Sequence, residues 1–200
     1  MVGLTLAVVA MTVLHVRQAE LDPIQQPVSY YIHGRSGWLL NLALAALGGA
    51  SIALAWALPI SQRSRAAFGL AAFGLGMLID AAARSDRFFP WERTPSVAGV
   101  IHAALALLAP PLLLLPMLRL LRGERPSWRQ SAKCVAAIAY AIGLLASGVS
   151  LVTGFLRDGP PPLIGLAERE LALSAVLWLA MLALDLARMK RNEKALPSVA

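Results

Sequence analysis

The sequence has little charge, few aromatic residues and almost no cysteine. Charged residues make up 14% of its 200 positions and aromatic residues 6%, whereas apolar residues make up 58%. A soluble domain carries about a quarter charged residues, so this balance excludes an ordinary soluble domain, and the apolar content excludes disorder. Cys134 is the only cysteine, which excludes an internal disulfide framework. An integral membrane protein remains.

The excess of positive charge lies in short segments beside apolar runs. The formal net charge is +7. A nucleic-acid-binding domain would gather its lysines and arginines on a folded polar surface or carry a recognised motif, and the sequence does neither. The observed pattern is typical of topology signals and of contacts with anionic lipid headgroups. We therefore expect the lipid bilayer, and not nucleic acid, as the partner.

Six apolar runs account for most of the chain. A transmembrane helix needs about 20 predominantly apolar residues, because backbone in lipid must form its hydrogen bonds within the helix. The runs are continuous rather than alternating, which argues against membrane strands. The sequence therefore predicts one all-α transmembrane domain over residues 1–200, built as a six-helix bundle. The expected spans are 1–16, 37–60, 66–83, 97–121, 132–156 and 171–187.

The distribution of lysine and arginine predicts the orientation. Eleven lie on one side of the expected spans and seven on the other. The positive-inside rule then places both termini in the cytoplasm and the chain in the inner membrane. The first run has no basic segment before it, so we expect a retained helix rather than a signal peptide. On the outer side, residues 17–36 would form a structured loop with Tyr30 and Tyr31 at headgroup level.

Ionisable residues gather at the expected outer side. Asp80 would lie about one turn from the outer end of its span, and His102 lies at a similar depth in the next span. Both share a helix face with small residues, so we predict that their side chains face each other inside the bundle. Ionisable groups within a span are costly and by default mark a functional site. The polar pocket expected there would also contain Asp22, Ser29, His33, Asn41, Glu168 and Arg169.

Three kinds of function fit this pocket. It would bind a lipid or small amphiphile without catalysis. Alternatively, it would serve a metal-dependent membrane hydrolase, because imidazole and carboxylate ligate zinc and a carboxylate can act as general base. His15, His33 and His102 would then be the ligands, with Asp80 as base or fourth ligand and Ser29 as a further catalytic candidate. In the third alternative the chain is a structural subunit of a membrane complex, and the sequence leaves open whether the protein is an enzyme.

Small residues and prolines indicate how the spans pack. Pro110, Pro111 and Pro116 lie within the fourth span, where we expect a kink and freed backbone carbonyls. Asp185, near the cytoplasmic end of the last span, is expected to reach the interface or to pair with Arg188. Small residues recur at steps of three or four in the fifth span, which predicts a packing seam and is compatible with an oligomer. The seam contains Ala136, Ala139, Gly143, Ser147, Ser150 and Gly154.

Three groups of residues, in this order, carry a family resemblance. The first is Asp22-Pro23 with Pro27-Val28-Ser29 ahead of Gly37-Trp38-Leu39-Leu40-Asn41. The second is Phe89-Pro90 followed by Gly99 and His102, and the third is Gly165-Leu166-Ala167-Glu168-Arg169. On these groups the chain resembles the DUF998 family of bacterial and archaeal integral membrane proteins. The resemblance implies a six-helix fold with Ser29, Asn41, His102 and Arg169 gathered at the outer side. It implies no particular activity, and Trp91 departs from the acidic residue that the family often has soon after Phe-Pro.

Overall fold

The computed structural model describes residues 1–59, 63–121 and 127–195. In these residues the secondary structure is entirely helical, with six α-helices, one 3-10 helix and no strand. The all-α prediction is therefore confirmed. The helices are α1 (Val2–Arg17), η1 (Val28–His33), α2 (Trp38–Ala57), α3 (Arg63–Asp80), α4 (Val97–Leu120), α5 (Trp128–Arg157) and α6 (Ile164–Ala195).

Four of the described helices are long and apolar enough to cross a bilayer. They are α2, α4, α5 and, over Ile164–Asn192, α6. A helix rises 1.5 Å per residue, so 20 to 30 residues cover the hydrocarbon core of about 30 Å. α1 is apolar but has only 16 residues, and the 18 residues of α3 include charges at both ends. The chain is a membrane protein.

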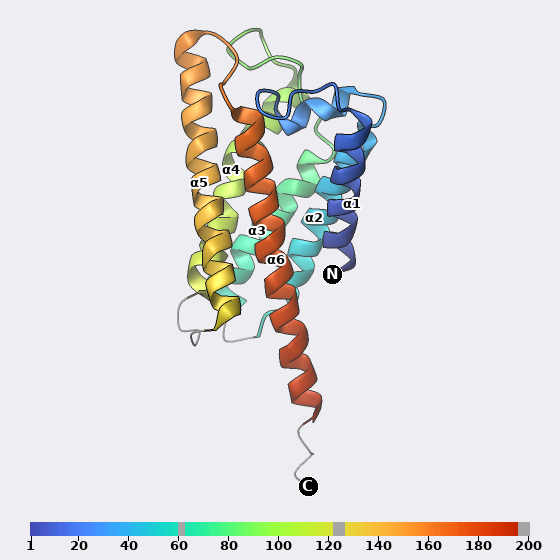
Figure 1. The fold of residues 1–200 in the computed structure, drawn as a ribbon, viewed down its shortest axis with the longest axis vertical. Helices are drawn as coiled ribbons and strands as arrows, with labels where there is room; N and C mark the ends of the chain where they lie inside the picture. The colour runs from blue at the N-terminus through green and yellow to red at the C-terminus, as the bar shows by residue number, and fades with distance from the viewer. Residues whose placement is uncertain (60–62, 122–126, 196–200) are drawn as a thin grey trace.

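The α-helices stand side by side in one bundle (Figure 1). α1 packs on α2, α2 on α3, α3 on α4 and α5 on α6, whereas α4 touches α5 less extensively. α6 also touches α1 and α2, which closes the ring of helices. The connections 18–37, 81–96 and 158–163 lie together at one end of the bundle, which we call the loop end. Away from this end, α6 extends beyond the other helices.

Two helices begin where a serine caps them. The Ser96 hydroxyl accepts a hydrogen bond from the Gly99 amide at 3.0 Å, at the start of α4. The Ser127 hydroxyl accepts one from the Gln130 amide at 3.2 Å. Such caps satisfy amides that have no partner within the helix. Because of its cap, α5 begins at Trp128, before the apolar run that the sequence analysis used.

α6 differs most from the expected boundaries. It begins at Ile164 instead of at residue 171. Glu168 and Arg169 therefore lie in its second turn and do not mark its start. The hydropathy pattern did not indicate these first turns of α6, because three consecutive ionisable residues interrupt the apolar run there. α3 differs less, since it ends at Asp80 rather than at residue 83.

Glycines set the separation of α2 and α3. A Cβ atom at Gly48 would lie 2.6 Å from the carbonyl oxygen of Gly74, and a Cβ at Gly74 would lie 2.6 Å from that of Gly48. The two backbones can approach this closely only without side chains. Ser51 adds a polar tie, because its hydroxyl donates to the Leu70 carbonyl at 2.9 Å. Small residues and interhelical hydrogen bonds are what hold helices together in lipid.

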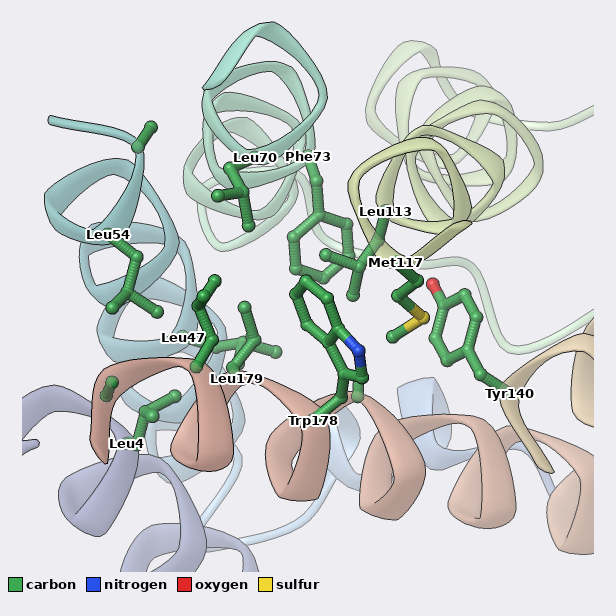
Figure 2. Packing of buried hydrophobic residues seen from close by; sticks show 14 of the residues in the cluster. Leu4, Leu47, Leu54, Leu70, Phe73, Leu113, Met117, Tyr140, Trp178 and Leu179 are labelled. Carbon is green, nitrogen blue, oxygen red and sulfur yellow. The ribbon is translucent and has the colours of Figure 1, made fainter. Parts of the chain in front are cut away.

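The core of the bundle is centred on Trp178 of α6 (Figure 2). Its side chain is fully buried and belongs to one cluster with Phe73 of α3, Met117 of α4 and Tyr140 of α5. The Tyr140 hydroxyl donates to the Pro110 carbonyl at 2.9 Å. Trp178 lies ten residues beyond Glu168 along α6, which corresponds to about 15 Å of helix. The closely packed core therefore lies well below the loop end.

The close approach of α2 and α3 generates a prediction. Gly48→Ala should lower the free energy of unfolding in detergent by about 1–3 kcal/mol, because the new methyl group overpacks the interface. Gly49→Ala is the matched control, since a Cβ there meets nothing within 4 Å. Denaturation by sodium dodecyl sulfate in mixed micelles measures both variants. Equal stability of the two would contradict the close approach.

Candidate functional site

A cavity of about 400 Å³ lies inside the bundle beneath the loop end. Each helix from α2 to α6 contributes to its lining, as do Val28 and Ser29 of η1. Most of the lining is apolar. Three ionisable side chains, Asp80, His102 and Glu168, line it as well, and no lysine or arginine does so among the described residues. All three are placed near the loop-end termini of their helices, so the cavity has a polar end and an apolar body.

Asp80 and His102 form a direct pair at the polar end. His102 Nδ1 lies 2.7 Å from Asp80 Oδ1. The His102 side chain is 19% exposed and the Asp80 side chain is 7% exposed. Asp80 is the last residue of α3, and His102 lies in the second turn of α4. The contact predicted from their equal depth is confirmed, and it leaves Nε2 as the ring nitrogen that Asp80 does not use.

Glu168 brings a second carboxylate to the polar end. Its Oε2 accepts a hydrogen bond from the Val28 amide at 2.7 Å, which ties η1 to α6. Glu168 lines the cavity together with His102 and Asp80. The negative charge of Glu168 also affects Tyr30 of η1. Burial raises the Tyr30 pKa to about 12, with further contributions from the negative charges of Glu92 and Glu168.

Further polar groups lie along the apolar body. Proline has no amide hydrogen, so Pro110 and Pro111 leave the carbonyls of Ala106 and Leu107 without their helical partners. Both residues line the cavity. Ser147 of α5 also lines it, and the Ser147 hydroxyl is buried with no hydrogen-bond partner in the described part of the chain. α4 nevertheless continues as one helix through its prolines.

The cavity reaches the surface between α4 and α5. Leu107 of α4 and Leu145 of α5 both line it, and they are 57% and 70% exposed. Gly148 lines it too, and a Cβ atom there would meet nothing within 4 Å. These residues are apolar and lie on membrane-capable helices.

Arg169 fastens the segment between α1 and α2 to α6. Its Nε donates to His15 Nε2 at 2.9 Å, and its Nη2 donates to the Tyr31 hydroxyl at 3.0 Å. Its Nη1 donates to the carbonyls of Pro23 at 2.9 Å and Gln26 at 3.0 Å. The guanidinium also lies over the Tyr31 ring, 5.4 Å from its centroid. Tyr31 is 1% exposed, so its side chain is buried within the protein, and its place at headgroup level stays a prediction.

The structure does not support the expected zinc ligands. Among the described residues, no three His, Cys, Asp or Glu side chains lie close enough together to hold a metal ion. His15 uses both ring nitrogens, because Nδ1 lies 2.8 Å from the Met11 carbonyl and Nε2 accepts from Arg169. His33 Nδ1 lies 3.5 Å from Arg84 Nη2. Only His102 and Asp80 of the expected set meet.

The expected pocket residues divide into two groups. Ser29 and Glu168 line the cavity, whereas Asp22, His33, Asn41 and Arg169 are not part of its lining. Asp22 instead caps a turn, because its Oδ1 accepts from the Ile24 amide at 2.8 Å. At His33, burial is the main cause that lowers the pKa, and the positive charges of neighbouring arginines lower it further.

Two polar contacts differ from what the sequence indicated. Asp185 pairs with Lys133 of α5 at 2.8 Å and with Arg129 at 3.4 Å, rather than with Arg188. Spacing along one helix indicates only neighbours on that helix, so it does not predict a contact between α5 and α6. Tyr140, the one tyrosine within a span, was not among the predicted site residues, although a phenol in lipid requires a polar partner.

A second, larger groove of about 680 Å³ lies between α1, α2 and α6. Its lining is made mostly of alanine, glycine and leucine, with Lys190 as its one charged side chain among the described residues. It lacks the convergent polar groups that fix a ligand's orientation. The smaller cavity is therefore the candidate functional site.

The apolar helices and the polar site among them define a helical membrane protein. The family model of DUF998, described as a protein of unknown function, matches residues 1–185. The chain belongs to this family. No curated protein and no solved structure matches the chain.

The Arg169 contacts generate a prediction at the loop end. Arg169→Lys should increase amide hydrogen exchange in residues 21–34 by about tenfold, because an ammonium cannot reproduce the planar set of donors and each lost charge-assisted bond costs about 1.5–3 kcal/mol. Hydrogen-exchange mass spectrometry in detergent measures this effect. Arg157→Lys is the control, since Arg157 is exposed at the same end. Unchanged exchange in both variants would show that Arg169 does not hold the segment.

Proposed function

We propose that this protein binds a single-chain lipid or amphiphile in the cavity beneath the loop end. The observation that carries the proposal is a cavity with an apolar body, a polar end and a sideways opening between α4 and α5. Ligand sites combine apolar walls with a few convergent polar groups in the same way. A volume of about 400 Å³ lies near the lower end of the usual range of about 300–1,000 Å³, which favours one alkyl chain over a two-chain lipid.

Binding is better supported than hydrolysis or a purely structural role. The expected metal ligands do not converge, as described above. No hydrogen bond in the described part of the chain joins the Ser29 hydroxyl to His102, which a serine nucleophile would need. A purely structural Asp80–His102 contact would need no open space beside it, whereas this pair lines a cavity.

Blocking the cavity should abolish binding. Ala106→Trp and Ala104→Trp both place an indole on an exposed position of α4, but only Ala106 lines the cavity. Dodecylamine, dodecanol and dodecanoic acid serve as probes with purified protein in phosphatidylcholine nanodiscs. We expect saturable binding of at least one probe, lost in Ala106→Trp and retained in Ala104→Trp. Binding of no probe, or equal binding by both variants, would overturn the proposal.

We also propose that all six α-helices span the inner membrane, with both termini in the cytoplasm. α1 and α3 pack along α2, and their 16 and 18 residues correspond to about 24 and 27 Å of helix. Loops, bound polar groups and local bilayer thinning accommodate such short spans. The loop end carries the smaller share of basic residues, seven of eighteen, which favours its exposure outside the cytoplasm.

Cysteine labelling tests this orientation. In a Cys134→Ala background, Glu20→Cys at the loop end should react with a membrane-impermeant maleimide in spheroplasts. Arg191→Cys, near the opposite end of α6, should react only after permeabilisation. Both positions are exposed, so accessibility within the protein does not limit the reaction. The reverse pattern would overturn the orientation, and labelling of both in intact spheroplasts would overturn the even number of spans.

A further inference from the structure

We infer that the cavity takes an amphiphile whose head group is a protonated amine on a single alkyl chain. This inference rests on the proposed function and specifies its ligand class. Three observations support it: the charges at the polar end, the hydrogen bonds that Arg169 already makes elsewhere, and the hydrogen-bonding groups of the lining.

The polar end lacks positive charge. Asp80 and Glu168 contribute two carboxylates, and the single imidazole of His102 can balance only one of them. No described lysine or arginine lines the cavity. A buried charge without a partner costs several kcal/mol in a protein interior. A cationic head group at this end would supply the missing charge.

The basic residue nearest to Glu168 in the sequence already donates its hydrogen bonds to groups outside the cavity. Arg169 follows Glu168 directly, yet its guanidinium donates to His15, Tyr31 and backbone carbonyls of the preceding segment. It does not line the cavity. A phosphate, sulfate or ionised carboxylate in the cavity would therefore meet carboxylates without meeting an arginine. This arrangement disfavours anionic lipids as occupants.

Several hydrogen-bonding groups of the lining are acceptors that a donor-rich head group can use. The carboxylates of Asp80 and Glu168, when ionised, act only as acceptors, and the prolines leave the carbonyls of Ala106 and Leu107 as acceptors without their helical partners. The Ser147 hydroxyl, which has no described partner, can accept as well. An ammonium group carries three donors and no acceptor. Its hydrogen-bonding capacity therefore complements this lining.

The apolar body of the cavity favours an alkyl chain as the remainder of the ligand. Leu44, Phe73 and Leu144 line it, and the exposed Leu107 and Leu145 flank its opening between α4 and α5. An alkyl chain there gains little from leaving lipid, because the surrounding acyl chains are equally apolar. Discrimination among amphiphiles must therefore come from the head group, which the polar end contacts.

The head-group series tests this inference at pH 7 in phosphatidylcholine nanodiscs. Dodecylamine, dodecanol and dodecanoic acid share one chain length and differ in head-group charge. Binding that Ala106→Trp removes is counted as cavity binding. We expect dodecylamine to bind at least about tenfold more tightly than either other probe, because a hydrogen bond between charged groups contributes about 1.5–3 kcal/mol. The three probes are ranked on the unaltered protein, and Ala106→Trp serves only to identify which binding is in the cavity.

A second measurement assigns the effect to the carboxylate. Glu168→Gln keeps an oxygen that can accept from the Val28 amide and removes the charge. It should weaken dodecylamine binding about tenfold and leave dodecanol binding unchanged, with Asp80→Asn as the substitute if Glu168→Gln fails to accumulate. Cavity binding of dodecanol or dodecanoic acid that equals or exceeds that of dodecylamine would overturn the amine inference and leave amphiphile binding intact. No cavity binding by any probe would overturn both.

Discussion

The hydrogen bonds of Arg169 hold the loop end of the molecule in place. One guanidinium joins α6 to His15 of α1, to Tyr31 of η1 and to two carbonyls of the connecting segment. Because η1 is held there, the Val28 amide can donate to Glu168, and Val28 and Ser29 line the loop-end part of the cavity. A planar group with five donors can satisfy this many partners at once, and a lysine cannot.

The core of the bundle and the candidate site differ in how they accommodate polar groups. Around Trp178 the side chains are buried in one cluster, and the hydroxyl of Tyr140 is satisfied by a carbonyl of α4. Beneath the loop end, Asp80 of α3, His102 of α4 and Glu168 of α6 line the cavity instead. Intramembrane ionisable residues are costly and are retained where they face a cavity or a partner. Asp80, His102 and Glu168 have both.

Part of the site could be predicted because membrane depth follows from the sequence. Asp80 and His102 end and begin consecutive spans at the same level, and the small residues beside them indicate inward faces. Their 2.7 Å contact agrees with that prediction. The predicted zinc ligands do not come together, and the reason is physical. His15 and His33 share the same end of the bundle, but depth does not determine lateral position, and hydrogen bonds with Met11, Arg169 and Arg84 already engage them.

The sequence by itself determined an all-helical membrane protein with Asp80, His102 and Glu168 near one end, because hydropathy and charge act through position along the chain. It also predicted the packing seam of α5, since small residues at steps of three or four share one helix face. Only the tertiary structure decided which polar groups meet. Arg169 reaches His15 across 154 positions of sequence, and Asp185 pairs with Lys133 of another helix. Such contacts depend on the order of helices around the bundle, which neither hydropathy nor spacing encodes.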